Sequence, residues 1–344
     1  MNTEIIDYRK FRSEVLREAR SRAKIEKCFL CEQKGGPFCN SHLIPRFILK
    51  NISTDGNVLN FNRFALNSDF TDMECGLNKA GTFYNICRKC DNTYFSDYED
   101  EENIRNFTFS NRFLAQIIIK NFLSRLYKRS IDGLMPEIIN EKKSIISNMG
   151  FIQNICNLDM RDYNEDLLRQ RNIIERNLSK KHYIIFQQKL DYKVPFAVQA
   201  HISLHKNLNG DIINDVYCMD STYKIRSLHL CIFPLVDKTI IILFIDKFSQ
   251  KRYRSFIQSF NKLPIGEKLQ YITYLSFKYT EDIFFSPLLP NSILENKELQ
   301  LLSQEVYDKP CLGWNFLGED EACYQYKPVD YHNIPNLLSR EYCI

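Results

Sequence analysis

The sequence has few of the features that mark membrane proteins, repeat proteins or common enzyme families. Its one tryptophan is Trp314, and nothing beside that residue suggests stacking on nucleic-acid bases. No apolar run approaches the roughly 18 residues that cross a bilayer, and the richest, Thr239 to Ile245, has the length of a strand. A repeat period, a glycine-rich phosphate loop, a Gly-x-Ser-x-Gly segment and a supported Ser-His-Asp order are all missing. We therefore expect a soluble protein that does not contact membranes.

The charge and the cysteine content of the chain further limit the class of protein to which it can belong. The 344 residues include 46 Lys and Arg against 42 Asp and Glu, and this excess is too small to indicate a nucleic-acid partner unless the cations gather on one surface. The chain has twelve cysteines, and its start lacks a secretory leader pattern. Paired thiols in a reducing compartment bind metals more often than they form disulfides. We expect a cytoplasmic protein that uses cysteines for a metal.

Two Cys-x-x-Cys pairs are the most informative pattern in the chain. Cys28 with Cys31 and Cys87 with Cys90 each place two sulfurs on one tight turn. Four thiolates in two such pairs match a tetrahedral structural Zn²⁺. Cys39 and Cys75 lie in the same region but lack this spacing. The sequence predicts a zinc module at the start of the chain.

Hydrophobic periodicity predicts an α+β protein with two domains, at 1–108 and 109–344. Helical spacing is expected over 8–27, 110–129, 162–180, 249–263, 265–278 and 293–306. Strands are expected over 182–190, 196–206, 212–219, 226–235 and 239–247, with Asn209-Gly210 as a hairpin turn. Five successive strands with short links predict an antiparallel meander. The polar stretch 60–80 between the two cysteine pairs is expected to be a loop insertion.

The first third of the chain resembles the zinc-containing HNH, or ββα-metal, endonucleases. The resemblance rests on the two cysteine pairs, on Ser41-His42-Leu43-Ile44-Pro45 between them, and on Cys90-Asp91-Asn92. It implies a treble-clef ββα module held by structural Zn²⁺. The rest of the chain carries no such resemblance, and its periodicity predicts a helical segment and an antiparallel-sheet domain with C-terminal helices. The resemblance also implies cleavage of phosphodiester bonds, most readily in double-stranded DNA, and a setting in phage defence.

The resemblance assigns chemical roles to three residues. His42 would deprotonate the attacking water, since imidazole is largely neutral near pH 7. Asp91, with Asn92 beside it, would hold a catalytic Mg²⁺ or Mn²⁺ through oxygen ligands. In the family, an acidic residue precedes the base, whereas this chain has Ser41 at that position. The family also has an Asn or His on the helix, whereas this chain has Asp91 there. The central asparagine of the family has no secure counterpart, although Asn85 lies nearby.

The segment before the first cysteine pair reads as a basic amphipathic helix. An apolar stripe alternates with positive residues, which we expect to contact nucleic-acid phosphates: Arg9, Arg12, Arg17, Arg20 and Lys24. The alternative is a helix packed on the domain with a solvated charged face.

Several other interpretations stay open. His42 could also be a zinc ligand or a structural imidazole. Glu74 or Asp72 could supply the carboxylate that the metal site lacks at Ser41. His201, His205 and His229 could form a second metal site or lie on the solvent-exposed face of the sheet. The whole chain could be an inactive zinc-scaffolded regulator that binds nucleic acid or protein, or a sensor whose C-terminal domain binds a small ligand. That domain could also mediate a homo-oligomer or a partner contact.

Overall fold

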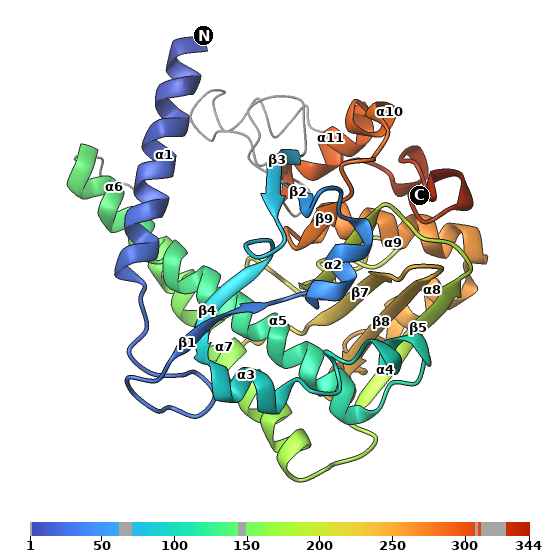
Figure 1. Cartoon of the computed structure of the whole chain (residues 1–344), viewed down its shortest axis with the longest axis horizontal. Coiled ribbons are helices and arrows are strands. Elements are labelled where there is room, and N and C mark those ends of the chain that lie inside the picture. The colour runs from blue at the N-terminus through green and yellow to red at the C-terminus, as the bar shows by residue number, and fades with distance from the viewer. Residues whose placement is uncertain (1, 62–70, 144–148, 307–308, 311–327) are drawn as a thin grey trace.

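The structure, a computed structural model, describes the chain except for residues 1, 62–70, 144–148, 307–308 and 311–327 (Figure 1). It mixes helices with antiparallel sheets, as the sequence predicts. The elements of the first third are α1 (Asn2–Arg22), β1 (Phe38–His42), α2 (Arg46–Ile52), β2 (Asn57–Phe61), β3 (Thr71–Gly76), β4 (Thr82–Cys87), α3 (Arg88–Tyr94) and α4 (Glu101–Arg105).

The remaining elements form a helical segment, a sheet and a set of C-terminal helices. The helices are α5 (Asn111–Asp132), α6 (Met135–Lys143), α7 (Met149–Glu175), α8 (Arg254–Lys262), α9 (Ile265–Tyr279), α10 (Asn291–Leu294) and α11 (Lys297–Ser303). The strands are β5 (His182–Leu190), β6 (Phe196–Ile202), β7 (Leu228–Pro234), β8 (Thr239–Asp246), β9 (Ile283–Phe285), β10 (Glu305–Val306) and β11 (Lys309–Pro310).

A β-hairpin followed by a helix forms the frame of the cysteine region. Strands β1 and β4 pair antiparallel, with Phe38 opposite Cys87 and His42 opposite Thr82. Helix α3 begins directly after β4. This is the ββα arrangement that the sequence predicts, with α2, β2 and β3 inserted between the two strands of the hairpin.

The second sheet has seven antiparallel strands in the order β3-β2-β9-β6-β7-β8-β5. Strands β6, β7 and β8 are buried along their whole length. Successive side chains of a strand alternate between faces, and the sheet has an apolar core on each. Ala197 and Phe233 pack with the cysteine region and α5, whereas Val198 and Ile232 pack with α8 and α9. The sheet therefore has no wet face over its central strands.

The predicted five-strand meander is wrong in two respects. The stretch 212–219 contains no strand, because Asn207 accepts hydrogen bonds from the backbone N–H groups of Asn209 and Asp211 and closes a local turn. Only a single bridge, between Lys206 and Ile212, remains of the predicted hairpin. In addition, β5 pairs with β8 at the sheet edge rather than with its neighbour in sequence, β6.

Helix α5 lies at the centre of the molecule (Figure 1). Ser110 caps its first turn by accepting a hydrogen bond from the Phe113 N–H. The predicted helix is present, but it is buried on several sides rather than along one stripe, because it packs against α7, β4 and β6. The predicted helix over 293–306 is instead two short helices, since Asn296 caps α11 through the Leu299 N–H.

The sheet crosses the predicted domain boundary at residue 108. Part of the stretch 60–80, expected to be a loop, belongs to the paired strands β2 and β3. Strand β2 in turn pairs with β9, with Leu59 opposite Phe285. Residues before 108 thus extend the sheet formed mainly by residues after it.

Candidate functional site

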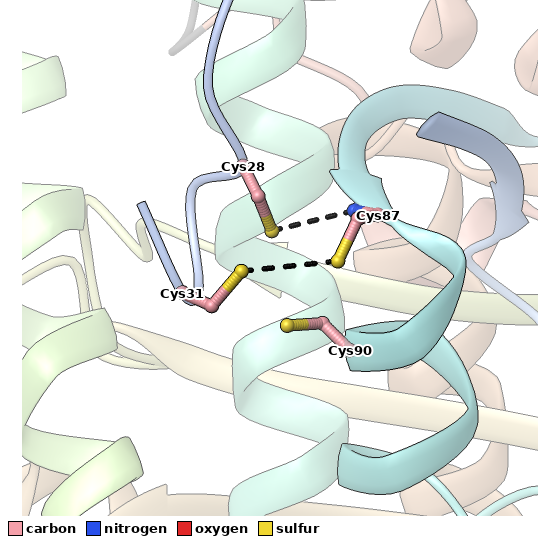
Figure 2. Close-up of side chains that lie close together, drawn as sticks. All are labelled: Cys28, Cys31, Cys87 and Cys90. Carbon is pink, nitrogen blue, oxygen red and sulfur yellow. Dashed lines mark hydrogen bonds between the residues drawn. The ribbon is translucent and has the colours of Figure 1, made fainter. Parts of the chain in front are cut away.

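The four cysteines of the two predicted pairs come together from three parts of the chain. Cys28 and Cys31 lie on the turn after α1, Cys87 ends β4, and Cys90 lies in the first turn of α3 (Figure 2). Their sulfur atoms all lie within 4.8 Å of one another. The Cys87 N–H donates to Cys28 Sγ over 3.3 Å, which fixes the turn against the end of the strand. We call this group the four-cysteine cluster.

The four-cysteine cluster has the dimensions of a metal site. A tetrahedral Zn²⁺ with Zn–S distances of about 2.3 Å sets neighbouring sulfurs roughly 3.8 Å apart, and Cys31 Sγ lies 3.8 Å from Cys87 Sγ. Burial raises the pKa of the Cys28 and Cys90 thiols. Against the effect of burial, hydrogen bonds from Cys90 and the other cysteines lower the pKa of Cys87, which favours the thiolate that a metal binds. These residues could hold a metal ion, and the donor set suits zinc.

His42 lies at the end of β1 and is half-buried. Its Nε2 is 2.9 Å from the backbone oxygen of Leu77. Because a carbonyl oxygen only accepts, this hydrogen bond places the imidazole proton on Nε2. A neutral ring then has Nδ1 free of a proton.

Asp91 makes its contacts within a group of polar side chains that is partly buried. The Ser41 hydroxyl donates to Asp91 Oδ1 over 2.6 Å. The Lys120 ammonium lies 2.7 Å from Ser41 Oγ, 2.9 Å from Asp91 Oδ1 and 2.9 Å from Glu99 Oε1. We call these four residues the Lys120 cluster. They bring together β1, the first turn of α3, the segment before α4, and α5.

The Lys120 ammonium is enclosed and fully paired. Its side chain has no exposed area, and the ring of Phe95 lies 4.1 Å from the nitrogen. An ammonium has three N–H donors, and three oxygens surround this one. Asp91 is 19% exposed and Glu99 is 41% exposed, so the anionic side of the cluster reaches solvent while the cation does not.

The predicted catalytic pair is not joined by any hydrogen bond between described residues. Ser41 and His42 are neighbours on β1, and neighbouring strand residues point to opposite faces. Ser41 contacts Asp91, whereas His42 contacts Leu77. Asn92 is exposed on α3. The catalytic roles of His42, Asp91 and Asn92 stay predictions.

Other candidates from the sequence have structural partners. The Asn85 amide is fully buried and donates to the Leu123 backbone oxygen on α5. Cys39 contacts Asp91 at 3.7 Å, and neither it nor Cys75 belongs to the four-cysteine cluster. Glu74 is exposed on β3, and the Asp72 side chain lies outside the described residues.

The predicted histidine group does not form a metal site in the described part of the chain, where the four-cysteine cluster is the one group with metal-binding geometry. His201 and His229 are buried with ring centroids 6.2 Å apart, against the aromatic ring of Phe122. The Asn121 amide donates to His229 Nδ1. The alternative of a solvent-exposed face is also wrong, because helices cover that face of the sheet.

The predicted phosphate-binding residues of α1 fall into three groups. Arg17, Arg20 and Lys24 are exposed and form no ion pair with any described residue. Arg12 is half-buried and has a partner. The Arg9 side chain lies outside the described residues.

Sequence reasoning missed Lys120 and the role of Glu99. The available signal was a lysine within the apolar run Ile117-Ile118-Ile119 and before Phe122, on a helix with little polar surface. A charge in such a place is rarely buried without a partner. The acidic stretch downstream of Cys90 supplies that partner, although most of its carboxylates are solvated as expected.

Within the described residues, no helix is both long and apolar enough to cross a membrane. Comparison with known proteins adds no assignment: no family model, no curated protein and no solved structure matches this chain.

Proposed function

We propose that the first third of the chain is a zinc-stabilised scaffold for binding nucleic acid, in which an internal ammonium takes the place of a catalytic divalent cation. The observation that supports this proposal is the Lys120 cluster. By resemblance, Ser41 and Asp91 occupy the two positions from which HNH enzymes bind their metal. In this chain the Lys120 nitrogen lies within 2.9 Å of an oxygen of each.

The distances make the ammonium and a metal mutually exclusive at this point. Mg²⁺ binds oxygens at about 2.0–2.1 Å and requires near-octahedral geometry. A metal bound by both Ser41 Oγ and Asp91 Oδ1 would overlap the Lys120 nitrogen and repel its charge. The ammonium is also shielded from solvent, so it does not itself reach a phosphate. In this proposal the zinc-held module binds nucleic acid but does not hydrolyse it.

Metal binding and cleavage can be measured directly. We expect plasmid DNA to stay intact with the zinc-loaded protein in Mg²⁺ or Mn²⁺, and we expect a Mn²⁺ titration followed by electron paramagnetic resonance to give the same result for wild type and Asp91→Asn. Cleavage, or a Mn²⁺ site that disappears in Asp91→Asn, would overturn the proposal. Elemental zinc analysis of both proteins controls for loss of the scaffold.

The second candidate is a metal-dependent HNH-type endonuclease acting in phage defence. The geometry of His42 favours it: the ring stands half-buried at the end of β1, and the bond to Leu77 leaves Nδ1 able to accept a proton. A histidine base held in one tautomer by a hydrogen bond to its other ring nitrogen is a recurring arrangement in general-base catalysis. In this proposal Asp91 and Asn92 hold the cation after Lys120 has withdrawn.

His42→Ala distinguishes the two candidates. If the chain is a nuclease, this variant retains its zinc and loses Mg²⁺- or Mn²⁺-dependent cleavage by about 100-fold or more. His332→Ala is the matched control, because His332 is exposed near the other end of the chain. Cleavage that survives in His42→Ala would exclude His42 as the base.

A further inference from the structure

The exposed cations of the first helix, α1, that form no ion pair with a described residue lie on one side of it. At about 100° per residue, Lys10, Arg17, Arg20 and Lys24 fall within an arc of about 80°, although Lys24 lies just beyond the helix end. All four are exposed and form no ion pair with any described residue. We call them the α1 basic stripe. From Lys10 to Lys24, fourteen steps of 1.5 Å along a helix axis, it spans roughly 21 Å.

The opposite side of α1 is fixed to the protein. Val15 and Ala19 are buried against Ile131 and Ile138, at the end of α5 and on α6. A cation on the packed side, Arg22, pairs with Glu18 on α1 and with an acid of α6. The division between paired and unpaired cations therefore follows the faces of the helix. Figure 1 shows α1 projecting at the side of the molecule beside α6.

We propose that the α1 basic stripe binds the phosphate backbone of a double-stranded nucleic acid, an inference that deepens the proposed function by naming the binding surface and the class of partner. An unpaired row of cations is the electrostatic signature of phosphate binding. Among the described side chains, the exposed acids near the stripe are Glu14, at its margin, and Glu26, beyond its end, and neither forms an ion pair with it. No counter-ion within the described part of the protein competes with the phosphates.

The composition of the stripe favours a duplex over two other anionic partners. Helices that bind membranes present a large apolar face to the lipid, but the apolar residues of α1 pack inward, and none of the large exposed apolar side chains lies on residues 10–27. Single strands are bound by aromatic side chains on which the bases stack. The stripe offers only charged groups, which suit contacts with the phosphate backbone of a duplex and not with its bases.

The cations around the four-cysteine cluster do not enter this proposal. Lys27 faces Lys34 across a β-bridge, and Arg88 and Lys89 begin α3. Four thiolates with a bound Zn²⁺ would together carry two negative charges, which these nearby cations would offset. The metal site would account for these cations, whereas no carboxylate of the described residues forms an ion pair with the stripe.

The test is duplex binding by a charge-reversed triple variant. Binding of a labelled duplex of about 25 base pairs, as DNA and as RNA, is measured by fluorescence anisotropy against salt without added Mg²⁺ or Mn²⁺. We expect Arg17→Glu/Arg20→Glu/Lys24→Glu to reduce the slope of log K against log salt by about 3. Affinity at 0.1 M salt should fall at least tenfold. Glutamate is a good helix former, and circular dichroism with zinc analysis verifies the fold.

A matched control carries the same change in net charge elsewhere. Lys251→Glu/Arg254→Glu/Lys262→Glu alters three exposed cations on and beside α8. Duplex binding that survives the α1 triple variant, or falls equally in the control, would overturn the proposal. The proposal would also be overturned if the wild-type protein does not bind duplexes but binds phosphatidylserine vesicles or polyglutamate. Because no divalent metal is added, these outcomes are independent of cleavage. Duplex binding that survives the α1 triple variant would overturn the stripe proposal alone and leave the proposed function standing, whereas a wild type that does not bind duplexes would overturn both.

Discussion

At the scale of single residues, Lys120 is a buried charge that we expect to contribute strongly to stability. Removing one member of a buried ion pair leaves the other charge without compensation and typically costs 3–5 kcal/mol. Asp91 is 19% exposed, so the lower end of that range applies. We expect Lys120→Met to lower the free energy of unfolding by about 3 kcal/mol, measured by urea denaturation.

A second substitution separates lost charge from lost packing. In Asp91→Asn/Lys120→Met the uncompensated carboxylate of Asp91 is gone, so part of the stability should return. Lys89→Met, an exposed lysine on α3, controls for removal of a surface cation. If the double variant is less stable than Lys120→Met by the full cost of Asp91→Asn alone, the ion pair is not what holds Lys120 in place.

At the scale of elements, Gly81 marks where the turn before β4 meets the large sheet. Its φ is +60°, and a Cβ there would lie 2.7 Å from Cζ of Phe284 on β9. Contacts below 3.0 Å force a shift, and the Phe284 ring is 5% exposed in a packed core. We expect Gly81→Ala to cost about 2–4 kcal/mol, the sum of a strained left-handed φ and overpacking.

Gly56→Ala is the reference for strain alone. Gly56 also has a positive φ, +75°, but no atom lies within 4 Å of a Cβ placed there. This variant should cost about 1 kcal/mol in the same denaturation experiment. Equal losses for the two variants would mean that the contact with Phe284 contributes nothing.

Elements defined by local pattern were predictable from the sequence, and elements defined by distant pairing were not. The cysteine spacing predicted the turns of the four-cysteine cluster, and β-branched or aromatic runs predicted β5, β7 and β8 closely. Strand β3 is polar and gains its place by pairing with β2, which pairs with β9 more than 200 positions away. No local signal encodes that contact.

The Lys120 cluster could not be predicted from the sequence either, because its contacts join residues that are far apart in the chain. Its members are separated in sequence by as much as 79 positions, between Ser41 and Lys120. The family resemblance suggested Asp91 as a metal ligand, and the packing of α5 supplies a competing cation that the resemblance does not include. A pattern identifies candidate ligands, whereas packing determines which cation they meet.

At the scale of the whole molecule, the four-cysteine cluster predicts a strong dependence on metal. Structural zinc contributes on the order of 10 kcal/mol to small modules, and here the cluster joins the turn after α1 to β4 and α3. We expect Cys87→Ser to lose zinc, measured by elemental analysis, and to unfold at a temperature more than 10 °C lower. Cys343→Ser, an exposed thiol outside the cluster, should change neither quantity.

Buried histidines predict a loss of stability in mild acid. Burial lowers the pKa of His229 to about 3 and that of His182 to about 4, whereas an unfolded chain titrates near 6.5. Below pH 6.5 the unfolded chain takes up protons that the folded chain excludes. Each imidazole therefore lowers the free energy of unfolding by up to about 1.4 kcal/mol per pH unit until its folded pKa is reached.

The slope between pH 6.5 and pH 5 tests this assignment. In His229→Gln it should be smaller than in wild type by about 1 kcal/mol per pH unit, whatever the change in absolute stability. Urea denaturation at several pH values measures it, and exposed His332→Gln is the control. An unchanged slope would show that His229 is not the group that excludes the proton.

The insertion between the two cysteine pairs has a kinetic consequence. A bound metal would close a ring of chain between Cys31 and Cys87, and β2 and β3, which lie within that ring, are paired into the large sheet. Amide hydrogens of β2 and β9 should then exchange with deuterium much faster after chelation than before, although these strands lie outside the cluster. The metal would set the opening rate of a sheet edge that it does not contact.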